Sequence, residues 1–241
     1  MKRTFGVAAL LALLGAGAMS TTAMAQCGTG PMVILKTASF AYETGTPVGS
    51  PYVSAAGNVL TIVGLVQSFC APFLDLNALM PASEFTVVYT GLTSLGTTHP
   101  LASFWNTNYG SGTFQIWQGT PPNAPTSAAA MPALPSVSIP GVYQDGTLIL
   151  SGTITGFNIG VSQSGTNPAS GSYRGDFTFT GGSLYSRVAS TPSVVGQGLL
   201  CVSGCLPSAG GYSGQVDGKI DTPPPTAALG STWGALKMLY R

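Results

Sequence analysis

The sequence is poor in charged residues. Asp, Glu, Lys and Arg together make up 6% of the 241 residues, and the formal net charge is +1. A typical soluble domain carries about 25% charged residues. So little positive charge gives no basis for binding DNA, RNA or an anionic membrane surface, and we expect no nucleic-acid partner. At 44% hydrophobic residues, the chain is also too apolar for an intrinsically disordered protein.

Catalytic motifs are scarce as well. The single histidine, His99, lies among Thr and Pro residues, and one histidine cannot build a His-based metal site. The sequence contains no G-x-S-x-G nucleophile elbow, no H-E-x-x-H motif and no phosphate-binding loop. We therefore predict no catalytic residues, no metal and no cofactor. A glycoside hydrolase that uses two carboxylates is the weakest alternative; the seven candidates are Glu43, Asp75, Glu84, Asp145, Asp176, Asp217 and Asp221.

The first 25 residues have the pattern of an export signal. Lys2 and Arg3 precede an apolar run over residues 5–19, and Ala23-Met24-Ala25 forms a cleavage site. The run is shorter than the roughly 18 residues that cross a bilayer, and no later segment resembles a membrane helix. We expect a mature chain that begins at Gln26, has no transmembrane segment and is extracellular or on the cell surface, with the periplasm also possible.

Four cysteines remain in this mature chain, and export favours disulfide bonds between them. Three pairings are possible. Short loops favour Cys27–Cys70 and Cys201–Cys205. A four-cysteine zinc site is the alternative, but Cys27 and Cys70 do not form the second short pair that such a site needs.

The mature chain is a series of apolar or alternating segments separated by Gly, Pro, Asn and Asp, which is typical of β-strands and turns. Helical periodicity is missing from residues 26–221. We predict an all-β domain, an antiparallel β-sandwich with a barrel as the alternative. The expected strands cover residues 33–42, 59–70, 84–92, 113–118, 147–159, 176–180, 184–188, 199–202 and 215–220.

Two proline-rich segments divide the chain. Residues 119–141 contain six prolines, which a central strand cannot hold, so we expect a long surface connection inside one domain over residues 26–221. Residues 222–226 include three consecutive prolines and form a stiff linker.

A C-terminal helix is predicted over residues 227–241. Its apolar residues share one helical face: Leu229, Trp233, Leu236 and Tyr240. Residues 231–241 resemble short C-terminal tails of some exported bacterial surface proteins, which implies sorting or attachment. Docking of this face onto the domain is the alternative.

One aromatic segment is a candidate for recognition. Exposed Trp and Tyr rings stack on sugar rings, and neighbouring amides bind sugar hydroxyls. The candidate residues are Trp105, Asn106, Asn108, Tyr109 and Trp117. Alternatively, the aromatic rings pack at the rim of the core and the polar residues form a turn.

These features favour an exported structural or adhesive protein over an enzyme. Low net charge gives little repulsion between copies and permits self-association. A carbohydrate-binding module with a polysaccharide partner is the alternative.

Overall fold

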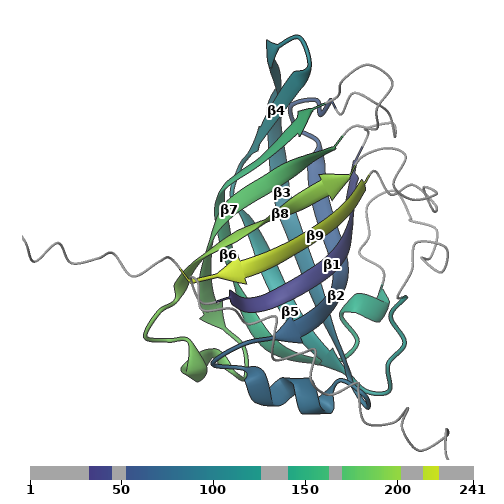
Figure 1. Cartoon of the computed structure of the whole chain (residues 1–241), viewed down its shortest axis with the longest axis vertical. Coiled ribbons are helices and arrows are strands. Elements are labelled where there is room, and N and C mark those ends of the chain that lie inside the picture. Colours follow the sequence, from purple (N-terminus) through teal and green to yellow (C-terminus); the bar gives the residue numbers. More distant parts are fainter. Residues whose placement is uncertain (1–32, 45–52, 126–140, 163–169, 202–213, 223–241) are drawn as a thin grey trace, which may run out of the picture.

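The computed structural model describes residues 33–44, 53–125, 141–162, 170–201 and 214–222 (Figure 1). The expected signal segment, the middle of the proline-rich connection, the triproline linker and the C-terminal helix lie outside these residues. Among the described residues, no helix is long and apolar enough to cross a membrane.

Nine strands and three short 3-10 helices make up the described fold. The strands are β1 (Val33–Glu43), β2 (Val59–Phe69), β3 (Glu84–Leu101), β4 (Phe104–Tyr109), β5 (Gly112–Gly119), β6 (Thr147–Ser162), β7 (Ser170–Gly181), β8 (Ser193–Cys201) and β9 (Gly214–Asp221). The 3-10 helices are η2 (Leu74–Leu79), η4 (Gly141–Tyr143) and η5 (Tyr185–Arg187).

All nine strands belong to one antiparallel sheet that closes on itself. Except for β4 and β5, strands that are consecutive in sequence pair with each other, and β9 pairs with β1 to complete the circle. The consecutive strands β4 and β5 share one position, because both pair with β3 on one side and with β6 on the other. The result is an eight-position, up-and-down barrel (Figure 1).

The all-β prediction is confirmed, and the barrel alternative describes the sheet better than the sandwich. A sandwich needs two separate sheets packed face to face, whereas here every described strand is hydrogen-bonded into a single sheet. Alternating residues predict one buried face per strand in both architectures, so the alternation alone did not separate them. Strands before and after the proline-rich connection share this sheet, which agrees with one common core.

Aromatic rings pack against glycines inside the barrel. An added Cβ at Gly196 would lie 2.2 Å from Cε2 of Phe177, and one at Gly152 would lie 2.4 Å from Cε1 of Phe114. The rings of Phe114 and Phe177 are tilted at a centroid distance of 5.2 Å. Glycines on the narrow interior surface therefore provide the space that the rings fill, as expected in small barrels.

A second apolar cluster covers the outside of the barrel over β1 to β3. Its buried residues are Tyr42, Val63, Val88, Ala124 and Tyr143. Ala124 and Tyr143 flank the proline-rich connection, and Thr86 of β3 donates a hydrogen bond to the carbonyl of Tyr143 at 2.8 Å. Burial raises the pKa of Tyr42, while a hydrogen bond with Thr61 lowers it. The described ends of the connection thus pack on the sheet.

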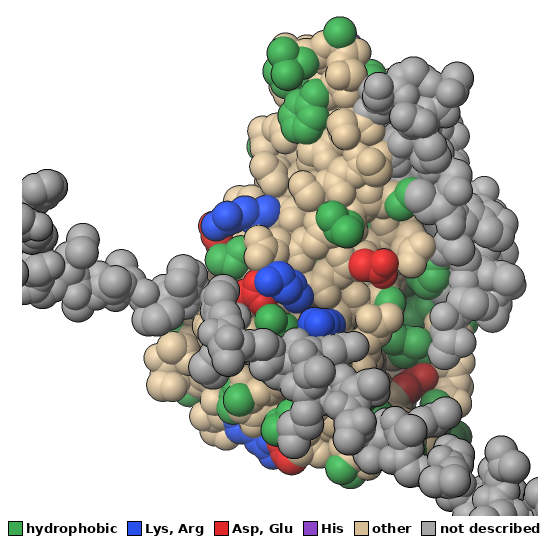
Figure 2. Space-filling model, viewed as in Figure 1, with side chains coloured by type: hydrophobic (Ala, Val, Ile, Leu, Met, Phe, Trp, Pro, Cys, Tyr) green, Lys and Arg blue, Asp and Glu red, His purple; other side chains and the backbone are tan. Residues whose placement is uncertain are grey.

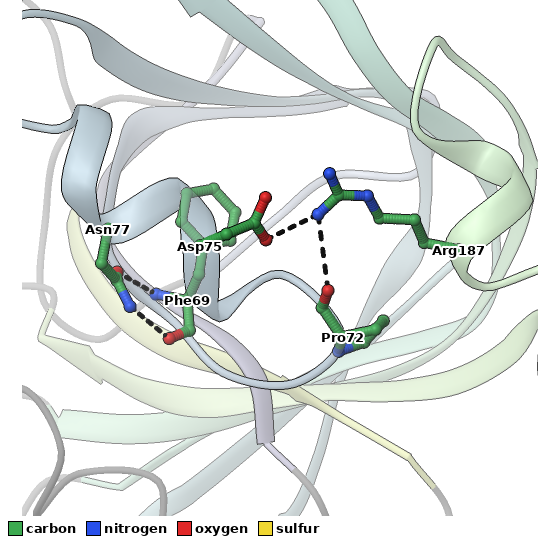
Figure 3. Close-up of polar contacts among 5 residues, drawn as sticks. All are labelled: Phe69, Pro72, Asp75, Asn77 and Arg187. Carbon is green, nitrogen blue, oxygen red and sulfur yellow. Dashed lines mark hydrogen bonds and ion pairs between the residues drawn. The ribbon is translucent and has the colours of Figure 1, made fainter.

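One end of the barrel is closed by η2 and η5. Arg187 of η5 donates to the carboxylate of Asp75 in η2 at 2.6 Å (Figure 3). Its guanidinium carbon also lies 5.9 Å from the ring centroid of Phe73. Asn77 bonds both the amide and the carbonyl of Phe69 at 2.9 and 2.8 Å. The hydrogen bond with Arg187 lowers the pKa of Asp75. These contacts hold η2 against the end of β2, where it closes the barrel.

The predicted strand over residues 184–188 is wrong, because these residues form η5 and its flanks. Gly182 has φ of +102° and turns the chain after β7, and Val188 is buried in the core at this end. The apolar residues of segment 184–188 therefore close this end of the barrel and do not form a strand beside β7. The next strand that pairs with β7 is β8. The sequence analysis predicted only the last part of β8, as a strand over residues 199–202.

Cys70 and Cys201 both take part in disulfide bonds, but not with each other. The amide of Cys70 donates to the carbonyl of Ile34 at 2.8 Å, whereas Cys201 is in register with Gln215, which faces Phe40. Ile34 and Phe40 are six positions apart on β1, which corresponds to about 20 Å along the strand. A disulfide requires Cα atoms within about 7 Å, so each cysteine has a different partner.

Substituting Gly196 with alanine should destabilise the barrel. The new Cβ would overlap the ring of Phe177, and overpacking of this kind costs about 1–3 kcal/mol. Denaturant unfolding should show this loss for Gly196→Ala and almost none for the control Gly141→Ala, where no atom lies within 4 Å of the added Cβ. Equal stability of both variants would contradict the packing described here.

Peptide mapping without reduction should find Cys27 joined to Cys70 and Cys201 joined to Cys205. Cys27 and Cys205 lie outside the described residues, but chain length limits their reach. Four residues span at most about 14 Å, which cannot bring Cys205 from Cys201 to the level of Cys70. A peptide linking Cys70 to Cys205 would show that this pairing is wrong.

Candidate functional site

The β3–β4 hairpin, residues 94–109, projects beyond the rest of the sheet (Figure 1). The last β2 partner of β3 is Thr93, opposite Val59, whereas β3 continues to Leu101 and pairs there with β4. Gly91 has φ of +76° at a register shift between β2 and β3. This bulge lets β3 bend as it leaves the barrel.

Aromatic stacking occupies part of this hairpin. The ring of His99 stacks on Trp105 with a centroid distance of 4.7 Å and an interplanar angle of 12°. Trp105 is half-buried and His99 is exposed. The pair therefore presents one imidazole face to solvent on an aromatic support.

Two leucines of β3, one before and one after His99 in the sequence, are exposed. Leu95 is 67% exposed and Leu101 is 68% exposed. The two leucines are six positions apart on β3, about 20 Å along the strand, so large apolar side chains remain in water along much of the hairpin. The hairpin is therefore the best candidate contact element on the described surface.

A buried polar network anchors the base of the hairpin. Tyr109 of β4 donates to one carboxylate oxygen of Glu43, and Ser54 donates to the other at 2.6 Å. Thr97 of β3 accepts the amide of Ser54 at 2.7 Å and shares a 2.7 Å hydrogen bond with Thr107. Glu43 is 8% exposed. Because the carboxylate is bonded by two hydroxyls, it ties the hairpin to β1 and to the segment before β2.

The five predicted recognition residues do not form one surface. Tyr109 is buried in the network just described. Trp117 lies on β5, twelve residues and roughly 40 Å along the strand direction from Trp105, and donates to Gln115 at 3.3 Å. Asn106 and Asn108 alternate with Trp105 along β4, so they lie on the opposite face of the hairpin. Of the three predicted aromatic rings, only Trp105 lies on the hairpin outside the core, and His99 covers one of its faces.

This segment is a strand, although one interpretation of the sequence made it a turn. β4 covers Phe104–Tyr109, and its asparagines pair with β6. Asparagine is unfavourable in strands and favourable in turns. Alternation of Phe104, Asn106 and Asn108 with Trp105, Thr107 and Tyr109 was the signal that could have revealed it.

Basic residues form a row on the outer wall. Arg174 of β7, Lys219 of β9 and Lys36 of β1 are in register, with Gln197 of β8 between the first two. They border a groove of about 580 Å³ whose lining includes Gly198 and Gly218. Lys219 forms an ion pair with Asp221 at 2.7 Å. Figure 2 shows basic and acidic side chains close together on this face, so its charge is largely balanced.

Two carboxylates approach each other beside Gly119. A Cβ built on this glycine would lie 3.1 Å from Oε1 of Glu84 and 3.4 Å from Oδ1 of Asp145. A glycoside hydrolase needs its two carboxylates on either side of a glycosidic bond. Of the grooves on the described surface, one is lined by Asp145 and another by Glu84, and neither holds both carboxylates. Across the part of the chain that the structure describes, no three His, Cys, Asp or Glu side chains gather as a metal cluster.

Comparisons with protein-family models, curated proteins and solved structures find no match to this chain. The candidate site is therefore inferred from the geometry of this structure alone.

Removing the Tyr109 hydroxyl should weaken the base of the hairpin. Tyr109→Phe takes one donor from the buried carboxylate of Glu43, and such a loss costs about 1–3 kcal/mol. Thermal or denaturant unfolding measures it. Tyr185→Phe, a half-buried tyrosine at the other end of the barrel, is the control and should stay near wild type. If the two variants are equally stable, the hydrogen bond from Tyr109 to Glu43 does not stabilise the base of the hairpin.

Proposed function

We propose that the protein is an exported structural or adhesive module that self-associates through its β3–β4 hairpin. The observation that carries this proposal is the exposure of Leu95 and Leu101, at 67% and 68%, on an element that projects from the barrel. On the side of β2, strand β3 continues eight residues past Thr93, its last β2 partner.

The packed barrel supports the proposal as a rigid base. Its interior has the contacts of a core, with Phe114, Phe177 and Phe179 at centroid distances of 5.2 Å. The buried bonds of Glu43 join this core to the hairpin. Rigid presentation reduces the entropy lost when a surface binds a partner.

The low charge of the chain supports association between copies. The net charge of +1 is almost zero, so two copies repel each other little. β4 is paired with β6 along its length, but beyond Thr97 the outer edge of β3 pairs with no other described strand, so a strand of a second copy can add there. A second copy is therefore the proposed partner, and attachment at a cell surface follows from assembly of many copies.

Sedimentation of the mature protein over a range of concentrations tests the proposal. Wild type should associate as its concentration rises, and Leu95→Ser with Leu101→Ser should shift the protein to the monomer with an unchanged melting temperature. The matched control is Leu199→Ser on β8, because Leu199 is 72% exposed but lies on the outer wall. It should associate like wild type.

Two results would count against the proposal. One is a wild-type protein that stays monomeric at all concentrations. The other is equal association of the hairpin double variant and wild type, which would place the contact elsewhere.

A further inference from the structure

Glu84 is buried at the start of β3 with only one of its oxygens satisfied. The residue is 7% exposed. Its Oε2 accepts the backbone amides of Asn123 and Ala124 at 3.0 and 2.7 Å. Its Oε1 has no hydrogen-bond partner within the described ranges. A buried carboxylate oxygen without a partner is costly, so this oxygen needs a ligand.

A second carboxylate faces the same point. Asp145 precedes β6, and its Oδ2 accepts the side-chain amide of Asn123 at 2.6 Å. Its Oδ1 and the Oε1 of Glu84 both lie within 3.4 Å of the position that a Cβ of Gly119 would occupy. Because residue 119 has no side chain, the two oxygens border a small space. Glu84, Gly119 and Asp145 come from three separate parts of the chain.

Two negative charges this close favour a cation between them. The described basic residues do not supply it. Lys36, Arg174 and Lys219 form the row on β1, β7 and β9, and Arg187 is paired with Asp75 at 2.6 Å. A bound cation would satisfy both carboxylates at once.

We propose that Glu84 and Asp145 bind a calcium ion beside Gly119. Calcium takes six to eight oxygen ligands at about 2.3–2.6 Å and accepts irregular geometry. The two carboxylates supply charged ligands, and water completes the shell because Asp145 is exposed. Because Oε1 of Glu84 is closed to solvent, a small ion fits the site better than a larger organic ligand.

The site ties together both ends of the proline-rich connection. Gly119, Asn123 and Ala124 lead into it, and Asp145 leads out of it. The same ends pack over the outer cluster of β1 to β3. Calcium would therefore stabilise the connection against the sheet, and this effect is independent of the hairpin and its partner.

Calcium titration of the full mature protein tests the site. Relative to EDTA, calcium at a hundred times its dissociation constant should raise the melting temperature by about 5–10 °C. Terbium serves as a luminescent calcium analogue, and Trp117 is its expected sensitiser since it lies two residues before Gly119 on β5. Excess calcium should quench the sensitised emission.

Neutral variants identify the ligands. Glu84→Gln and Asp145→Asn should both lose the thermal shift and the emission. In EDTA, Glu84→Gln should be at least as stable as wild type, because an unpaired buried charge has been removed. The control Asp217→Asn, on β9, should keep the full response.

No thermal shift and no sensitised emission in wild type would overturn the proposal. So would a full calcium response in Glu84→Gln or Asp145→Asn. Loss of the response in Asp217→Asn as well would show binding without a defined site, and would also contradict it.

Discussion

The fold depends on the fit of aromatic rings to glycines inside a small closed barrel. Eight strand positions leave an interior just wide enough for side chains to fill. Phe177 lies where Gly175 and Gly196 have no side chains, and Tyr173 lies against Gly198 and Gly218. Burial raises the pKa of Tyr173 well above its usual value, as expected for a phenol in such a core. The high glycine content is thus part of the packing and not only a source of turns.

The few carboxylates that are buried lie where strands of the barrel begin or end. Glu43 ends β1 and accepts bonds from the hairpin and from Ser54, while Glu84 begins β3 and accepts the amides after β5. Each therefore joins the sheet to a segment that leaves it. Only 6% of the residues are charged. These two carboxylates place strong hydrogen-bond acceptors where the backbone pairing of the strands ends.

Local patterns in the sequence predicted part of this fold. Continuous or alternating apolar residues placed β1, β2, β5 and β6 close to their observed bounds. The closure of the sheet was not predictable from alternation, since it depends on the pairing of β9 with β1 across the chain. β4 was obscured by its asparagines, and the role of Tyr109 by its distance in sequence from Glu43. Long-range contacts of this kind leave no local periodicity.

The same limit applies to the carboxylates beside Gly119. Glu84 and Asp145 are 61 residues apart in the sequence, and they come together because β5 pairs with β3 on one side and with the start of β6 on the other. Glycine at position 119 admits both oxygens, because any larger residue would place its Cβ against them. A glycine that looks like a strand end in the sequence therefore has a second role, which is to keep open the space between two charges. A cation in this space would satisfy the oxygen of Glu84 that accepts no hydrogen bond within the described residues, and it would offset the charge of both carboxylates.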